Sequence, residues 1–551
     1  MKPMRAPIKD GVIYSPYPVC SIPCSSIYTA IQRCIEASPD RIAIVDDSVQ
    51  LTRAQFFARI KRCAAGLQAH GIKPGDHVCV HLDTSVENLI AMFGFVFAGA
   101  TLILSYIGLN EDELLSHIKD GDVTHILTDF KNAKKCINLQ KQSSVNLMGL
   151  FINGELPGFI DVLELSTSDE SNFVEVDVPD PANTLAAICY TSGTTALSKG
   201  VEITHLSFVA SLYASKACMT DEGADVLLAC YPLTFASGFQ FIMSAACSGS
   251  TCVVVSPMMM FDRFAQVINE FQVTTISSSP TQLLYFTSEM RRTGVQLNSV
   301  RKINTGGTAP SEVLAKALMT VFRDLRCLRN NYSQSESCGL VFFPPSDEMD
   351  LRSMGFPAPM VQIKFVDIET GEPIGPEVPG ELCYKSPCSM RGYYKCPEKT
   401  SEFRDKDGWC HSGDIAYYDQ DGRVYFVDRL KEFIKCMNDK AYPSELENLL
   451  LKNHDEIAEV AVAGLPHDEH IEVAAAFVVL KESHKKDRKT TAAEMKKTVS
   501  DVCPIYKHLH GGVYFLDHLP RTPTAKVKRA ALKAYAASLG SSASDSITSS
   551  K

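Results

Sequence analysis

The sequence lacks the usual marks of secreted, membrane-spanning and nucleic-acid-binding proteins. No apolar stretch near its start resembles a secretory signal. Its one long apolar run, residues 89–104, is shorter than a membrane span and is interrupted by Gly94 and Gly99. It has no surplus of positive charge: 54 Lys and Arg against 64 Asp and Glu give a formal net charge of −10. These absences argue against nucleic acid as a partner and against a membrane span.

The 19 cysteines show no spacing typical of a disulfide framework. Spread over so long a chain, they favour a reducing, intracellular compartment. The chain ends in Ser549, Ser550 and Lys551, which resembles a peroxisomal S-K-L signal without its leucine. We therefore expect a cytoplasmic protein, with the peroxisome as the alternative.

A chain of 551 residues is too long for a single hydrophobic core, so we expect several domains. Thr52 and Gln55 form a predicted capping box at the start of a helix, and apolar strands are predicted at 78–82 and 101–104. A second predicted helix starts near Ser85. Repeated strand–helix–strand units of this kind predict parallel sheets covered by helices.

The pattern changes towards the C-terminus. From about residue 352, short strands alternate with Gly/Pro turns, which predicts a smaller antiparallel, β-barrel-like region. A third unit begins near residue 430, with a helix opening at Pro443 and strands at 459–463 and 473–480. The last eleven residues are mostly serine and are expected to form a loose tail.

A loop rich in hydroxyl groups follows the apolar strand predicted at 185–189. Residues 190–200 read YTSGTTALSKG, with small residues, hydroxyls and one lysine. Backbone N–H groups of such a loop can converge on a phosphate, and the lysine adds a movable positive charge. It does not match the Walker P-loop. By composition alone, an ordinary Ser/Thr/Gly-rich surface loop remains the alternative.

The order of residues in this loop is similar to the signature of the adenylate-forming superfamily, which includes acyl-CoA synthetases, 4-coumarate–CoA ligases and beetle luciferases. Four further motifs of that family follow in the expected order: NYSQSE at 331–336, DGWCHSGD at 407–414, DRLKEFIK at 428–435 and PRTPTAK at 520–526. The resemblance spans roughly residues 30–535. It is strongest to the coumarate ligase and luciferase branch.

The resemblance implies an α/β fold with a large ATP- and acid-binding domain over 1–428, a hinge over 429–431 and a small mobile α+β domain over 432–540, followed by the 541–551 tail. It also implies a two-step reaction. A carboxylate first attacks the α-phosphate of ATP to give an acyl-adenylate, and the thiol of coenzyme A then displaces AMP. Mg²⁺ would accompany ATP.

The resemblance assigns a role to each charged motif residue. Lys526 would lie between the attacking carboxylate and the α-phosphate, and Lys199 would hold the β- and γ-phosphates. Glu336, with Thr191, would hold Mg²⁺, and Asp414 would accept hydrogen bonds from the ribose hydroxyls. The whole set implied for ATP and AMP is Thr191, Ser192, Gly193, Thr194, Thr195, Lys199, Gly307, Thr308, Ala309, Asn331, Tyr332, Ser335, Asp414, Arg429 and Lys526.

Two further lysines belong to the mobile part. Lys431 stands where the family pivots its small domain between the two half-reactions, and Lys435 is implied in the second of them. His205 is a weaker candidate near the phosphate loop. Phe235, Ser237 and Gly307 would line the acid pocket, and Phe235, where a histidine is common in the family, favours an aromatic or apolar acid.

The sequence also departs from the family pattern. Ala196, Ser198 and Ala525 replace residues that are usually glycine or proline, and alanine is not favoured at positive φ. Ser333 and Asn438 also replace glycines. Two alternatives therefore accompany the ligase interpretation: a luciferase-like oxygenase acting on the same adenylate, and a homologue that binds nucleotide or acyl groups with impaired turnover. The expected partners are a small carboxylic acid, ATP and CoA, with the protein a monomer or homodimer.

Overall fold

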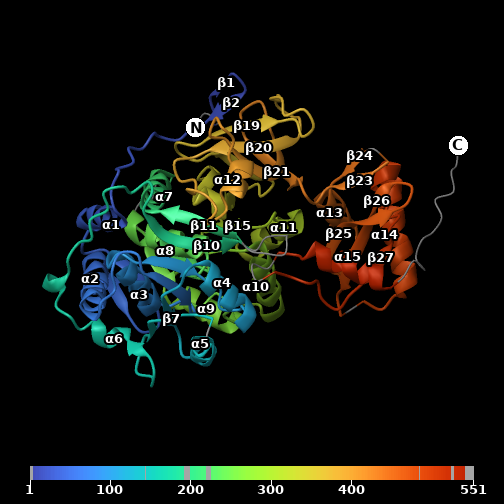
Figure 1. The fold of residues 1–551 in the computed structure, drawn as a ribbon. Helices are drawn as coiled ribbons and strands as arrows, with labels where there is room; N and C mark the ends of the chain where they lie inside the picture. The colour runs from blue at the N-terminus through green and yellow to red at the C-terminus, as the bar shows by residue number, and fades with distance from the viewer. Residues whose placement is uncertain are drawn as a thin grey trace.

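The computed structural model describes residues 4–142, 144–191, 199–218, 225–437, 439–482, 484–522 and 526–539. The described residues form three sheets with helices around them, and a C-terminal lobe (residues 432–539) stands beside the larger body (Figure 1). The mixed α/β class and the mainly parallel sheets of the large N-terminal part were predicted from the sequence, and both are confirmed. Among the described residues, no helix is both long and apolar enough to cross a membrane.

The first sheet has seven strands in the order β11-β10-β6-β5-β7-β8-β9 within the described part of the chain. Its neighbours pair in parallel, except that β10 and β11 are antiparallel. The strands are β5 (His77–His81), β6 (Thr101–Leu104), β7 (His125–Thr128), β8 (Gly149–Ile152), β9 (Ile160–Asp161), β10 (Leu185–Thr191) and β11 (Lys199–Thr204). The predicted phosphate loop therefore joins two paired strands, whose last register pair is Thr191 with Lys199.

The second sheet runs through fifteen described strands, parallel at one end and antiparallel at the other. Its parallel part is β3 (Ile42–Val45), β12 (Val226–Ala229), β13 (Thr251–Val254), β14 (Thr275–Ser278), β15 (Lys302–Gly306) and β16 (Cys327–Gln334), with β4 (Gln50–Thr52) antiparallel at the edge. Its antiparallel part is β1 (Ile8–Lys9), β2 (Val12–Tyr14), β17 (Gly339–Phe343), β18 (Ser353–Pro357), β19 (Gln362–Val366), β20 (Gly380–Lys385), β21 (Cys410–Tyr418) and β22 (Val424–Arg429). The β16–β17 pair joins the two parts, so the antiparallel region is a continuation of the parallel sheet.

Helices cover these sheets and fill the space between them. They are α1 (Ile27–Glu36), α2 (Arg53–His70), α3 (Val86–Phe97), α4 (Glu111–Asp120), α5 (Ala133–Gln140), α6 (Val162–Leu165), α7 (His205–Cys218), α8 (Ala236–Ser248), α9 (Phe261–Glu270), α10 (Pro280–Thr293), α11 (Glu312–Val321) and α12 (Pro397–Phe403), with the 3₁₀ turns η1 (Glu170–Asn172) and η2 (Ser335–Ser337). The largest core cluster draws side chains from α2, α3, α7 and α8 and from strands of both sheets. The helices α3 and α8 are thus buried between layers, which explains the apolar run at 89–104.

The predicted capping box at the start of α2 is confirmed. The Thr52 hydroxyl accepts a hydrogen bond from the Gln55 N–H at 3.2 Å, and the Gln55 side chain accepts one from the Thr52 N–H at 2.9 Å. The helix ends at Gly71, whose φ of 106° is a left-handed conformation that glycine adopts without strain. The helix predicted near Ser85 is confirmed as α3, with Ser85 as its N-cap.

The C-terminal lobe has its own sheet of β23 (Ile434–Cys436), β24 (Asp439–Ala441), β25 (Ile457–His467), β26 (Ile471–Leu480) and β27 (Val513–Phe515), packed with α13 (Pro443–Asn453), α14 (Arg488–Val502), η3 (Ile505–Lys507) and α15 (Arg529–Ser538). The helix predicted to open at Pro443 is α13, and the two predicted strands lie within β25 and β26.

Contacts of Ser444 and Lys440 help to fasten this lobe to the body. Asp428, at the end of β22, accepts hydrogen bonds from the backbone N–H and the hydroxyl of Ser444 at 3.0 and 2.9 Å. Lys440 forms an ion pair with Glu369 at 2.8 Å. The turn between them carries Lys431, which is exposed.

Candidate active site

Asp414 forms the centre of a buried polar network where β21 and β22 meet β16. Only 4% of this residue is exposed. The Tyr332 hydroxyl donates a hydrogen bond to its Oδ2, and the Gln334 amide donates another at 3.0 Å. Arg429, its register partner on β22, places Nε 3.7 Å from its Oδ1. Burial raises the pKa of Asp414, while Arg429 and the Tyr332 hydroxyl oppose that rise.

Glu336 belongs to a second group of contacts, together with Lys199 and Tyr393. The Tyr393 hydroxyl donates a hydrogen bond to Glu336 Oε1 at 2.8 Å. The ammonium of Lys199 lies 4.8 Å from the centre of the same tyrosine ring. Burial, followed by the charge of Glu336, raises the pKa of Tyr393, so the phenol stays protonated and acts as a donor. A half-buried carboxylate is an oxygen ligand of the kind that a hard cation prefers.

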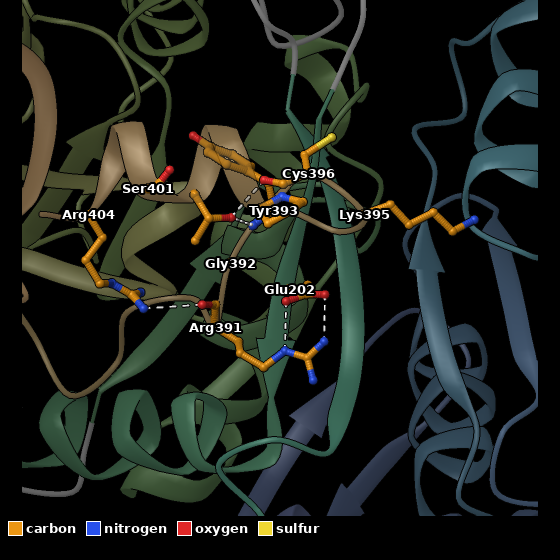
Figure 2. Close-up of a pocket in the computed structure, with 10 residues that line it drawn as sticks. Glu202, Arg391, Gly392, Tyr393, Lys395, Cys396, Ser401 and Arg404 are labelled. Carbon is orange, nitrogen blue, oxygen red and sulfur yellow. Dashed lines mark hydrogen bonds and ion pairs between the residues drawn. The ribbon is translucent and has the colours of Figure 1, made fainter. Parts of the chain in front are cut away.

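Figure 2 shows the pocket beside Tyr393. Arg391 lies in it and forms a two-pronged ion pair with Glu202, at 2.7 and 2.8 Å. Glu202 lies on β11, the strand that Lys199 opens, so this pair joins the 391–396 segment to the end of the predicted phosphate loop. The Thr400 hydroxyl accepts a hydrogen bond from the Tyr393 N–H at 2.9 Å, which fixes the tyrosine from α12.

The C-terminal lobe contributes Lys526 to these two groups. Its ammonium is close enough to Asp414, Arg429 and Glu336 for all three charges to act on it. Burial and Arg429 lower the pKa of Lys526 to about 8, and the two carboxylates oppose that shift. Its backbone N–H is held by the Thr522 hydroxyl at 3.1 Å. Described residues of all five sequence motifs therefore belong to these groups: Lys199, Glu336, Asp414, Arg429 and Lys526.

The adenine-side candidates lie along the ends of β15 and β16. Gly306 pairs in register with Asn331, and a Cβ on Gly306 would stand 2.4 Å from the Asn331 carbonyl oxygen. Gly307, with φ 86°, and Ala309 are exposed after β15, and Thr308 between them is half-buried. The Asn331 side-chain oxygen is buried and has no hydrogen-bond partner among the described residues. This leaves an acceptor free for a ligand's N–H group.

Other predicted residues lie elsewhere. Phe235 precedes α8, where its ring centre is 5.0 Å from that of Tyr106, and Ser237 is exposed in the first turn of α8. Lys435 is exposed on β23 and contacts the ring of Phe433 at 5.7 Å within the C-terminal lobe. His205 is buried and its Nδ1 accepts a hydrogen bond from the Ile27 N–H at 3.1 Å, a structural role.

Some predicted positions lie outside the described residues: Ser192, Gly193, Thr194, Thr195, Ala196, Ser198, Asn438 and Ala525. Thr191, at the end of β10, Ser335, at the start of η2, and Ser333, exposed on β16, are described. Sequence reasoning missed Tyr393 and Gln334. Gln334 stands inside a quoted motif, and its amide also donates to the Ser412 carbonyl at 2.8 Å. Tyr393 belongs to no quoted motif and was found only through the fold.

The fold and the assembled residues together define an adenylate-forming enzyme. The chain belongs to the AMP-binding enzyme family: the family model matches residues 31–394, and a model of the AMP-binding enzyme C-terminal domain matches residues 445–526. It is 29% identical over 505 residues to luciferin 4-monooxygenase of Photinus pyralis, covering 89% of this chain and 90% of that protein. It is 28% identical to probable 4-coumarate–CoA ligase 2 of Dictyostelium discoideum, over 95% and 98% of the two chains.

Solved structures agree with this assignment. The o-succinylbenzoate CoA synthetase of Bacillus subtilis, in complex with its acyl-adenylate intermediate, superposes with a TM-score of 0.76. It is 26% identical, and the match covers 92% of this chain and 98% of that chain.

Proposed function

We propose that this protein is an ATP-dependent carboxylate–CoA ligase that acts on an aromatic or a medium- to long-chain apolar acid. The observation that carries this proposal is that the buried Lys526 ammonium lies within the electrostatic influence of Asp414, Arg429 and Glu336. A lysine delivered by one lobe to a buried carboxylate and an arginine on the other suits a reaction between two anions.

In the first step, the acid's carboxylate oxygen attacks the α-phosphorus of ATP, and the bond to the bridging oxygen of pyrophosphate breaks. Both reactants are negatively charged, so the Lys526 ammonium neutralises the charge that accumulates between them. Asp414 accepts hydrogen bonds from the ribose hydroxyls, and this fixes the α-phosphate near that ammonium. The unpartnered Asn331 oxygen is suited to an adenine N–H group.

Glu336 would hold Mg²⁺, and Lys199 would contact the β- and γ-phosphates. When bound, the cation shields the phosphate charges. The Tyr393 hydroxyl restricts Glu336 by holding Oε1, which leaves its other oxygen for a cation. Thr191, the register partner of Lys199, would add a hydroxyl ligand.

In the second step, the coenzyme A thiol attacks the acyl carbon and AMP leaves. We propose that residues 432–540 rotate about 429–431 between the steps, which withdraws Lys526 and presents the face that carries Lys435. The Asp428–Ser444 and Lys440–Glu369 contacts would hold the orientation used for adenylation.

The acid preference rests on Phe235. Its ring lies against that of Tyr106, so two aromatic rings stand where the family commonly has an imidazole. A small, strongly hydrated acid would gain little from such a surface, whereas an aromatic or aliphatic acid would bury apolar area against it.

The test is incubation with ATP, Mg²⁺ and a panel of carboxylic acids, followed by CoA. We expect pyrophosphate release with apolar or aromatic acids and a CoA thioester after CoA is added. Pyrophosphate without thioester, together with light or oxygen uptake, would instead support a luciferase-like oxygenase, which the 29% identity to luciferin 4-monooxygenase keeps as the second candidate. Absence of pyrophosphate with every acid would contradict both and favour a binding protein.

The pH dependence of the first step should report Lys526. Its pKa of about 8 means that the ammonium is present below that pH and is lost above it. We therefore expect kcat/KM for pyrophosphate release to fall as the pH rises through about 8 in the nucleotide-free enzyme. The measurement is a pH profile of kcat/KM, with Lys526→Arg as the control. The fall should be absent in that variant, because arginine stays charged.

The hinge proposal makes a separate prediction. Lys431→Pro fixes φ near −65° and restricts Leu430, so the lobe should lose its freedom to rotate. We expect thioester formation from a supplied acyl-adenylate to fall by at least about tenfold, while adenylate formation falls by less than about threefold. Lys431→Ala, which keeps backbone freedom, is the control. Equal loss of both steps in the proline variant would contradict the hinge.

A further inference from the structure

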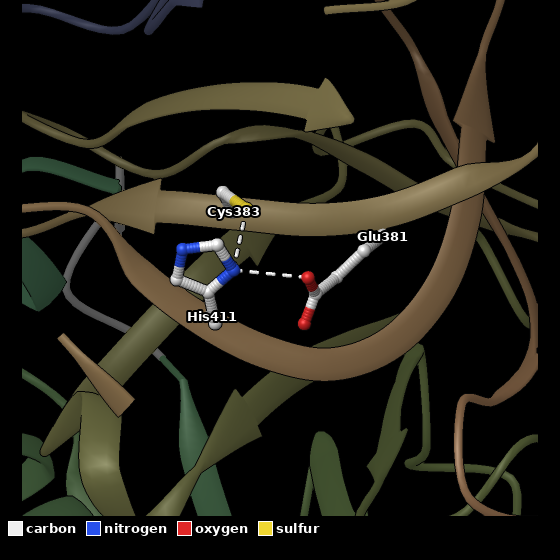
Figure 3. Close-up of side chains that lie close together, drawn as sticks. All are labelled: Glu381, Cys383 and His411. Atoms are coloured by element: carbon white, nitrogen blue, oxygen red, sulfur yellow. Dashed lines mark hydrogen bonds and ion pairs between the residues drawn. The ribbon is translucent and has the colours of Figure 1, made fainter. Parts of the chain in front are cut away.

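A cluster of three potential metal ligands lies on the antiparallel part of the large sheet, outside the groups described above. Glu381 and Cys383 are two residues apart on β20, and His411 is the register partner of Cys383 on β21. The side-chain ligand atoms of all three lie within 4.8 Å of one another. Figure 3 shows Glu381 and Cys383 converging on the same nitrogen of His411.

We propose that Glu381, Cys383 and His411 form a binding site for a thiophilic divalent cation of the Zn²⁺ class. A thiolate, an imidazole and a carboxylate are the three ligand types that zinc accepts, whereas Mg²⁺ and Ca²⁺ prefer oxygen alone. Three protein ligands leave a fourth position, which water would occupy.

The distances suit a small tetrahedral ion. His411 Nδ1 lies 3.5 Å from Cys383 Sγ, which is close to the ~3.5 Å expected between two ligands of one tetrahedral zinc ion. It lies 2.9 Å from Glu381 Oε2, so this pair would open by about half an ångström to admit the ion. The glutamate has the longest side chain of the three, and it can make that adjustment.

The surroundings of the cluster support a cation. Asp405 Oδ2 lies 3.8 Å from Nε2, on the other side of the His411 ring, where a carboxylate commonly orients a metal-bound histidine. The thiol forms the buried floor, while the side chains of Glu381 and His411 are 14% and 34% exposed. An ion can therefore enter from the His411 side.

Charge balance also favours binding. Binding of M²⁺ would displace the proton of the Cys383 thiol, and the thiolate together with the Glu381 carboxylate would neutralise the two positive charges of the ion. Lys364 and Lys385 both lie over the ring of Trp409, at 4.6 Å from its centre.

The site is coupled to the nucleotide side of the molecule through one residue. Glu381 Oε1 accepts a hydrogen bond from the Gly413 N–H at 3.2 Å, next to Asp414. Because the proposed ion uses Oε2, this bond can persist when the ion is bound. An occupied site would therefore hold the strand that carries Asp414.

The experiment is a Co²⁺ titration of the full-length protein after chelator treatment, in excess Mg²⁺ to occupy carboxylate sites such as Glu336. We expect one Co²⁺ per chain with a thiolate-to-cobalt charge-transfer band in the near ultraviolet. Cys383→Ser should lose the band, and His411→Asn should weaken binding by at least about tenfold. The control, Cys396→Ser, removes an exposed thiol and should change neither.

A second measurement covers variants that fold poorly. Zn²⁺ should raise the thermal midpoint of unfolding of the wild type and of Cys396→Ser. It should raise the midpoint of Glu381→Gln by less. A band that survives in Cys383→Ser, a band lost in Cys396→Ser, or no Co²⁺ bound at one equivalent would overturn the proposal. None of these readouts requires the enzyme to be active, so the cation site and the ligase function can fail independently.

Discussion

Lys526→Ala should reduce the rate of pyrophosphate release by at least about 10²–10³-fold and leave thioester formation from a supplied acyl-adenylate largely intact. The C-terminal lobe brings the ammonium of Lys526 to Asp414, Arg429 and Glu336. Its removal leaves two anionic reactants without the cation placed between them. The second step uses the other orientation of the lobe, in which Lys526 is withdrawn.

The measurement is paired: pyrophosphate release with ATP and acid, and thioester yield with acyl-adenylate and CoA. Lys528→Ala is the matched control, since it removes a neighbouring lysine in the same lobe and should leave both rates within about twofold. If Lys526→Ala lost both steps equally, a lobe with two working orientations would be the wrong description.

Asp414→Ala should raise KM for ATP by about 10²-fold or more. A buried carboxylate that accepts two ribose hydroxyls contributes about 1.5–3 kcal/mol for each charged hydrogen bond, and the factor of 100 corresponds to about 2.7 kcal/mol. The same change leaves the Tyr332 hydroxyl without its Asp414 acceptor and removes one of the two acceptors of the Gln334 amide. We expect AMP binding to weaken in parallel, as measured by calorimetry.

Two variants separate the binding effect from folding. Asp414→Asn preserves volume and removes the charge, so it should lose most of the nucleotide affinity with little loss of thermal stability. Asp421→Ala removes an exposed ion pair with Arg5 and should change neither quantity. Unaltered AMP affinity in both Asp414 variants would exclude the ribose role.

The local predictions succeeded where a signal lies within a few residues. The capping box of α2, the N-cap of α3 and the opening of α13 at Pro443 each depend on neighbours in sequence. The apolar run at 89–104 indicated burial but not location. Its placement between two sheets results from packing, since helix α3 contributes to a core built by both.

The candidate site was predicted unevenly for the same reason. Motif order alone selected Lys199, Glu336, Asp414, Arg429 and Lys526. It could not select Tyr393, because that tyrosine contacts residues that are far away in the sequence. Its hydroxyl donates to Glu336, 57 positions away, and the ammonium of Lys199 lies over its ring. Nor did it reveal that Tyr332 directs its hydroxyl at Asp414, 82 positions further on.

The sequence by itself determined the chemistry: which charged groups the chain possesses, their order, and thereby its membership of the AMP-binding enzyme family. Only the tertiary structure decided which of these groups meet. Strand pairing brings Asp414 beside Arg429. The lobe docks through Asp428 and Ser444, and in this orientation Lys526 lies near Asp414 and Arg429. Such encounters depend on pairing and packing between distant segments, which local patterns of residues do not encode.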